Sequence, residues 1–176
     1  MKIVFKISAI LLHIVKTDLG RSHTFAYERI GFLACKSSYS INGVLTVYAF
    51  DYVTVPNDCY IPDNTVGVRF GKEAIQQALA LAFNEGGQNV SVFHVHEHLG
   101  NNIPWFSHTD IKSAETFIPD IFNTAPKMPH GTLVLNETHG TGLVWVSKVA
   151  KPQHVDTFIS VGVPTIYSHY HERTIL

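Results

Sequence analysis

Two short motifs in this chain combine residue types that bind metals. His94-x-His96 places two histidines at alternating positions, and Ser107-x-x-Asp110 places a serine and an aspartate three residues apart. Neutral imidazoles and carboxylates are common protein ligands of zinc. His94, His96 and Asp110 together therefore predict a three-ligand zinc site. Three protein ligands leave the fourth tetrahedral position to water, as in catalytic rather than structural zinc sites.

A site of this kind indicates metal-assisted hydrolysis. Zinc lowers the pKa of a water in the fourth position from ~16 towards ~7, and a separate carboxylate must then pass the proton to the leaving group. Glu97 is nearest in sequence, but side chains alternate between the faces of a strand, so Glu97 should point away from His96. The carboxylates left open by the sequence are Glu28, Glu73, Glu85 and Glu137.

The two motifs fall on elements that could bring them together. The β-branched and aromatic run from Val90 to His96 predicts a strand that ends at the histidines. Ser107 predicts the N-cap of the next helix, with Asp110 at capping-box spacing. Pro119 is expected to end or kink that helix.

The rest of the chain predicts a mixed order of helices and strands. Apolar periodicity and turn residues predict strands over 1–6, 30–35, 44–55, 133–135 and 143–149. They also predict a helix between Ser8 and Gly20, with Ile10, Leu11, Ile14 and Val15 on its apolar side, and a second over 72–85, the latter ended by Gly86-Gly87. The expected turns are an Asn42-Gly43 hairpin, a loop over 56–65 and a glycine-rich turn around Gly140 and Gly142.

The composition is that of one globular domain over residues 1–176. The chain is 45% hydrophobic, which suffices for a core in a chain short for two domains. Its 13 basic and 14 acidic residues give a net charge of −1, which argues against nucleic acid or an anionic membrane surface as a partner. Two cysteines, Cys35 and Cys59, make neither a disulfide framework nor a zinc knuckle.

The apolar run from Ile7 to Val15 loosely resembles a signal peptide. His13 interrupts it, and no small-x-small cleavage site follows. The run is also too short to span a bilayer. We therefore expect a strand entering a buried helix here, in a cytoplasmic protein without a membrane partner.

Taken with residues 27–33, the two motifs resemble the signature of the JAB1/MPN/Mov34 metalloenzymes, the JAMM proteases. In that family a Glu precedes a Gly-Phe/Leu-Leu strand, two His and one Asp hold Zn²⁺, and a Ser orients the water and stabilises the oxyanion. The resemblance implies that Glu28 is the catalytic base and that Ser107 is the second catalytic residue. It makes His94, His96 and Asp110 the zinc ligands.

The resemblance covers roughly residues 1–150 and implies a fold. The expected class is α/β (α+β): a single JAB/MPN-like domain with a mixed curved sheet flanked by helices, in a cytidine-deaminase-like architecture. One spacing departs from the family. Ten residues separate His96 from Ser107 where relatives usually have seven, and the extra length falls near the loop at 100–102. We interpret it as a locally altered rim of the site.

The resemblance also implies a function. The chain is similar to bacterial stand-alone JAB-domain enzymes, which are zinc-dependent isopeptidases or peptidases that cut after the C-terminal tail of a ubiquitin-like protein. The implied partners are that protein or its conjugates and an E1- or E2-like enzyme. The implied task is processing or deconjugation in a bacterial conjugation system, some of which act against phage.

Two alternatives remain open. One is a non-catalytic MPN-type scaffold, and the other is a different zinc hydrolase, such as a metallo-β-lactamase type reading of His94-x-His96-x-His98. A zinc deaminase is excluded because the chain has no Cys-x-x-Cys. His98 is expected to lie beside the ligands or to face substrate without binding metal. Trp105 and Phe106 could line a substrate groove or pin the loop, and the expected surface histidines are His108, His169 and His171.

Overall fold

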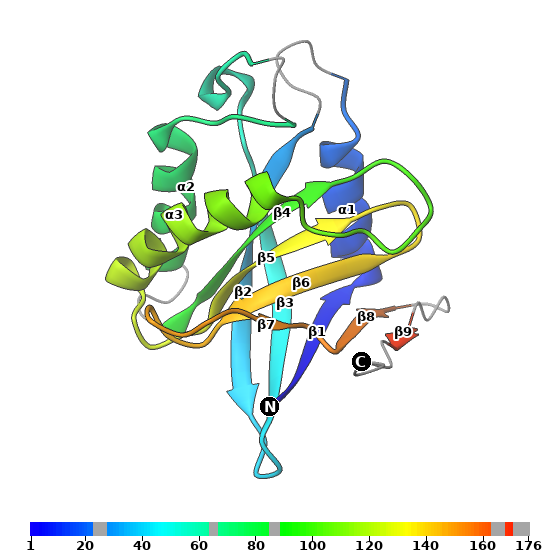
Figure 1. Cartoon of the computed structure of the whole chain (residues 1–176), viewed down its shortest axis with the longest axis vertical. Helices are drawn as coiled ribbons and strands as arrows, with labels where there is room; N and C mark the ends of the chain where they lie inside the picture. The colour runs from blue at the N-terminus through cyan, green and yellow to red at the C-terminus, as the bar shows by residue number, and fades with distance from the viewer. Residues whose placement is uncertain (23–27, 64–66, 85–88, 163–167, 171–176) are drawn as a thin grey trace.

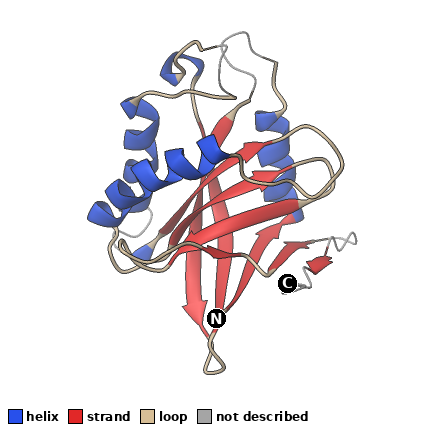
Figure 2. Ribbon diagram, in the orientation of Figure 1, coloured by secondary structure: helices blue, strands red, loops and turns tan. Residues whose placement is uncertain are grey.

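One mixed β-sheet organises the chain, in a computed structural model that describes residues 1–22, 28–63, 67–84, 89–162 and 168–170. The sheet curls, and its nine strands follow the order β7-β6-β5-β4-β2-β3-β1-β8-β9 (Figure 2). The strands are β1 (Lys2–Ser8), β2 (Ile30–Tyr39), β3 (Val44–Thr54), β4 (Ser91–Glu97), β5 (His130–Leu135), β6 (Gly140–Trp145), β7 (Gln153–His154), β8 (Thr157–Val161) and β9 (Ser168–Tyr170).

Helices lie on both faces of this sheet (Figure 1). They are α1 (Ala9–Leu19), α2 (Lys72–Asn84) and α3 (His108–Thr124), with a 3₁₀ turn η1 (Asn57–Cys59). Strands pair in parallel between β1 and β3, β1 and β8, and β4 and β5, and antiparallel elsewhere. The expected mixed α and β class is confirmed. Tyr27, Glu85, Gly86-Gly87 and His171 lie outside the described residues.

Two apolar clusters, one on each face, account for the layers. Helices α2 and α3 pack on the face of β4 that carries Val92, whereas α1 packs on the face that carries Phe93 and Val95. His94 and His96 share the alternation of Val92 and so lie on the α3 face. The sheet therefore separates the histidines from α1, as strand alternation predicts.

Helix α1 has the expected ends but a different buried face. The Ser8 hydroxyl accepts from the Leu11 backbone N–H at 3.1 Å, and Gly20 follows the last turn. Val15 and Leu19 are buried, whereas Ile10 is 77% exposed. The expectation that Ile10 and Ile14 share the buried side is wrong. The helix contacts the sheet through Val15 and Leu19, which lie four residues apart on one face.

Of the end or kink expected at Pro119, the end is wrong. Helix α3 continues through Pro119 to Thr124. Proline lacks one backbone donor, but Ile121 and Phe122 beyond it are buried against the core. Burial of these side chains offsets the lost hydrogen bond.

The turn expected around Gly140 and Gly142 lies just before them. Both glycines belong to β6, and the reversal occupies residues 136–139. The Asn136 side-chain carbonyl closes it by accepting from the Thr138 and His139 backbone N–H groups, at 3.0 and 2.7 Å. Gly142 serves packing instead, since a Cβ there would lie 2.7 Å from the Leu133 side chain.

None of the helices in the described ranges is both long and apolar enough to cross a membrane. The apolar run Ile7 to Val15 divides between the end of β1 and the first turns of α1. Ile7 and Val15 are buried in the apolar cluster between α1 and the sheet. The run is thus explained by packing.

His130 on β5 is fully buried and connects the backbone of β4 to the end of α3. His130 Nδ1 accepts from the Val92 backbone N–H at 3.0 Å, so its Nε2 carries the proton and donates to the Ala125 carbonyl at 2.8 Å. Burial lowers the pKa of His130 to about 4, although the contact with the Ala125 carbonyl raises it in part. The native protein therefore holds this imidazole neutral.

We expect acid to destabilise the fold through His130. Between pH 6.5 and 4 the unfolded chain binds a proton that the native imidazole excludes, so the free energy of unfolding should fall by about 3 kcal/mol. Urea unfolding in EDTA at the two pH values measures this loss. In His130→Gln the loss should shrink, and an unchanged pH dependence would contradict the assignment.

Candidate metal centre

The strand register explains how distant residues meet at one end of β4. Ile30 of β2 lies opposite His96 of β4 in an antiparallel pair. Continuing that register by two residues sets Glu28 opposite His98. Their side chains approach to 3.7 Å between Glu28 Oε1 and His98 Nε2. Sequence reasoning reached Glu28 through a family resemblance, whereas the structure brings it to the histidines through strand pairing.

His94 is a buried imidazole with one nitrogen unpaired. Its Nδ1 lies 3.1 Å from the Thr132 hydroxyl on β5, and its Nε2 has no hydrogen-bond partner among the described residues. The rings of Phe70 and Phe117 pack against it. Burial, followed by the nearby His96, holds the pKa of His94 well below its usual value. A neutral ring with Nδ1 engaged presents Nε2 as a lone pair.

The N-terminus of α3 supplies an ionised carboxylate. Ser107 Oγ accepts from the Asp110 backbone N–H at 3.1 Å, and Asp110 Oδ2 accepts from the Ser107 backbone N–H at 2.6 Å. This is the predicted capping box. Asp110 Oδ1 lies 3.5 Å from His96 Nε2. Burial alone would raise the pKa of Asp110, but its contacts with His96 and Ser107 hold it well below the ordinary value.

His98 lies beside His96 and Asp110. Its Nε2 is 3.2 Å from His96 Nε2 and 3.5 Å from Asp110 Oδ2. Ligand atoms of Glu28, His96 and His98 all fall within 4.8 Å of one another. Burial is the largest influence on the pKa of His98 and lowers it. The sequence indicated that His98 lies on the same face, since it continues the alternation of His94 and His96.

The expected ligands fit a zinc ion by donor chemistry. Among the described residues, however, the ligand atoms that lie within 4.8 Å of one another belong to Glu28, His96 and His98, a set without His94. Two buried imidazoles and an ionised carboxylate form the mixed nitrogen and oxygen donor set that zinc takes in catalytic sites. The unpaired Nε2 of His94 gives a specific reason, because a buried polar atom without a partner is costly and a metal would satisfy it. Thr132 is the hydrogen-bonding partner that fixes the ring.

The Glu28 carboxylate packs closely against Gly67. Its backbone N–H donates to the Gly67 carbonyl at 3.0 Å. A Cβ on residue 67 would lie 2.8 Å from Glu28 Oε2. Burial raises the pKa of Glu28, while His96 lowers it and Asp110 raises it. Nothing in the local sequence pattern singled out Gly67.

The other candidate carboxylates in the described residues lie elsewhere. Glu97 projects from the opposite face of β4, where the Lys16 ammonium partly offsets the rise in the pKa of Glu97 caused by burial. Lys16 Nζ also donates to the Glu137 carbonyl at 2.7 Å. Glu73 is in the first turn of α2. Strand alternation therefore turns Glu97 away from His96, as expected, and excludes it as the carboxylate that moves the proton.

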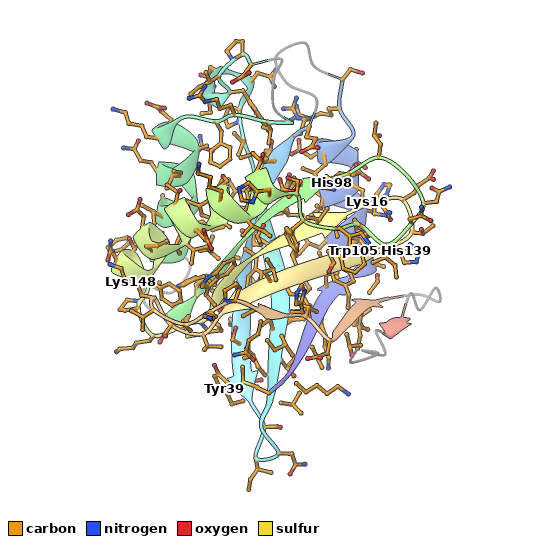
Figure 3. All side chains as sticks on the ribbon, in the orientation of Figure 1. Lys16, Tyr39, His98, Trp105, His139 and Lys148 are labelled. Atoms are coloured by element: carbon orange, nitrogen blue, oxygen red, sulfur yellow. The ribbon has the colours of Figure 1, made fainter. Side chains whose placement is uncertain are left out.

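A cavity of about 930 Å³ opens over these groups. Its lining residues are Glu28, Asp63, Gly67, Val68, Arg69, Phe70, His94, His96, His98, Leu99, Ser107, Thr109, Asp110 and Ser113. Trp105, labelled with His98 in Figure 3, is 71% exposed and does not line it. Phe106 packs against the core, so it pins the loop.

The longer connection from His96 to Ser107 is anchored at two points. The His98 backbone N–H donates to the Leu135 carbonyl at 2.9 Å. The buried Asn136 side chain donates to the Asn102 carbonyl in the middle of the loop. The turn after β5 thus holds the extra residues against the sheet end, which keeps the rim of the cavity in place.

Comparison with known protein families and with curated proteins finds no match. Among solved structures, the chain is similar to the STIL N-terminal domain of Trichoplax adhaerens, with 10% sequence identity and a TM-score of 0.37. That likeness covers 78% of this chain and 40% of the other. At this level it carries no argument about the site.

We expect Thr132→Val to weaken zinc binding by roughly ten- to a hundredfold, because it removes the group that orients His94. Titration calorimetry with Zn²⁺ measures the affinity. Thr132→Ser keeps the hydroxyl and should bind as the wild type does. Equal affinities for the valine and serine variants would show that the Thr132 contact does not serve a metal ligand.

Proposed function

We propose that this protein is a zinc-dependent isopeptidase or peptidase of the JAMM type. The observation that carries the proposal is the meeting of Glu28, His96 and Asp110 at one cavity, although they come from three separate segments. The proposed ligands are His94, His96 and Asp110. A zinc ion held there would supply Lewis-acid activation of a water and of the scissile carbonyl.

The chain's own carboxylate would move the proton. Glu28 lies on the rim of the ligand group, with Oε1 3.7 Å from His98 Nε2, and lines the cavity. From that position it takes a proton from the attacking water and returns it to the leaving amine. Its close packing against Gly67 restricts the directions in which the carboxylate can point.

Ser107 would stabilise the tetrahedral oxyanion. Its Oγ uses a lone pair to cap α3 by accepting from the Asp110 N–H. A hydroxyl has one O–H donor besides its lone pairs, so the cap leaves that donor available. Ser107 lines the same cavity as Glu28. One residue can therefore fix the helix start and donate to developing negative charge.

The substrate in this proposal is the C-terminal Gly-Gly tail of a ubiquitin-like protein or its conjugate, in the cytoplasm and alongside E1- or E2-like enzymes. The tail cannot pair with β4 as an added strand, because β2 and β5 already occupy the two edges of β4. Residues 67–70 line the cavity and pair with residues 59–61. We propose that a narrow glycine tail binds alongside them.

The first test separates the base from the metal ligands. Glu28→Gln should keep one zinc per chain and lose at least about a hundredfold in cleavage, since the general base is gone. His96→Ala should lose both zinc and cleavage. Zinc content is measured by atomic emission. Cleavage is followed on ubiquitin-like proteins whose C-terminal Gly-Gly is joined by an amide to a reporter.

Glu97→Gln is the matched control, because it removes a neighbouring carboxylate from the opposite face of β4. It should cleave at the wild-type rate. Wild-type cleavage by Glu28→Gln would refute the mechanism. Zinc-loaded wild type that cleaves no member of a broad panel of such fusions would refute the proposed substrate class.

A second test concerns the packing of Glu28 against Gly67. Gly67→Ala would set a Cβ 2.8 Å from Glu28 Oε2, so the carboxylate must move. We expect zinc content to stay and cleavage to fall by at least about tenfold, because small misplacements of a reacting group are costly. Gly71→Ala is the control, since its Cβ meets only the Glu73 carboxylate closely. Equal rates for the two variants would contradict the positioning role.

A further inference from the structure

We propose that His98 is a fourth protein ligand of the metal and fills the position that an open site leaves to water. The inference rests on the zinc site proposed above and adds a ligand to it. With His94, His96 and Asp110, the fourth ligand would close the coordination sphere in the resting protein. The site would open to substrate only when His98 leaves.

The distance between the Nε2 atoms of His98 and His96 matches one edge of a zinc tetrahedron. Bonds of about 2.0–2.1 Å place neighbouring ligand atoms about 3.4 Å apart. His98 Nε2 lies 3.2 Å from His96 Nε2 and 3.5 Å from Asp110 Oδ2. His96 Nε2 lies 3.5 Å from Asp110 Oδ1. The two imidazole nitrogens are therefore at the separation of two ligands of one ion, and Asp110 approaches each of them with a different oxygen.

Hydrogen bonding alone does not account for the same cluster. A neutral imidazole has one N–H, which can serve one acceptor well. His98 Nε2 nevertheless faces His96 Nε2, Asp110 Oδ2 and Glu28 Oε1, all between 3.2 and 3.7 Å. One shared proton can satisfy a single pair among these. A cation between them satisfies several lone pairs at once.

The backbone also holds His98 in a position suited to a ligand that can leave. Its N–H donates to the Leu135 carbonyl at 2.9 Å, just past the end of β4. Its side chain is 23% exposed, whereas that of His96 is 1% exposed. His96 is thus fixed inside the site, while His98 borders the cavity and has solvent to move into.

X-ray absorption at the zinc edge tests the ligand count on the zinc-loaded full chain. The spectrum should contain the outer-shell scattering of three imidazoles in the wild type and of two in His98→Gln. Zinc affinity, measured by titration calorimetry, should fall by at least tenfold in His98→Gln. His108→Gln changes an exposed histidine beside the same helix start and should match the wild type in both readouts.

Two imidazoles in both wild type and His98→Gln would overturn the proposal, as would equal zinc affinity of the His98 and His108 variants. His98→Ala repeats the comparison with a smaller side chain, and thermal unfolding in EDTA confirms that each variant folds. These readouts do not depend on cleavage. If no fusion is cut, the isopeptidase proposal fails while the imidazole count still decides the role of His98.

Discussion

The pairing of β4 with β2 on one side and β5 on the other is the constraint on which the site depends. Antiparallel register with β2 sets Ile30 opposite His96 and so delivers Glu28 to the end of the strand. Parallel register with β5 sets Thr132 beside His94, where its hydroxyl meets the imidazole. A slip of one residue would turn every histidine to the α1 face and leave the cavity without ligands.

The start of α3 couples stability to the same site. Ser107 and Asp110 satisfy each other's backbone N–H groups, which helix starts otherwise leave without partners. Asp110 still directs its second oxygen at His96. The ligand carboxylate is therefore held by the helix cap rather than by the loop before it, and its geometry survives the longer connection from His96.

Local sequence predicted the parts of the site that local chemistry determines. The run from Val90 to His96 predicted the strand and the face of its histidines, and Ser107 with Asp110 predicted the helix cap. What lay beyond prediction depends on pairing between distant segments. Gly67 carries no local signal, yet it accommodates the Glu28 carboxylate.

The same limit applies to residues whose surroundings are set by the fold. The position of His98 at the end of β4 depends on its backbone hydrogen bond to the Leu135 carbonyl, a contact that the local sequence does not indicate. Helix α1 was predicted with the correct ends, but the sheet beneath it determined that Ile10 is exposed. The metal, the reaction and the substrate remain proposals that rest on the arrangement of Glu28, His94, His96 and Asp110.

The most direct measurement is anomalous diffraction at the zinc edge from crystals of the full chain grown with Zn²⁺. We expect one strong peak within about 2.0–2.2 Å of His94 Nε2, of a His96 ring nitrogen and of an Asp110 oxygen, with Glu28 adjacent. No peak at the end of β4, or a peak held only by residues outside this group, would contradict it.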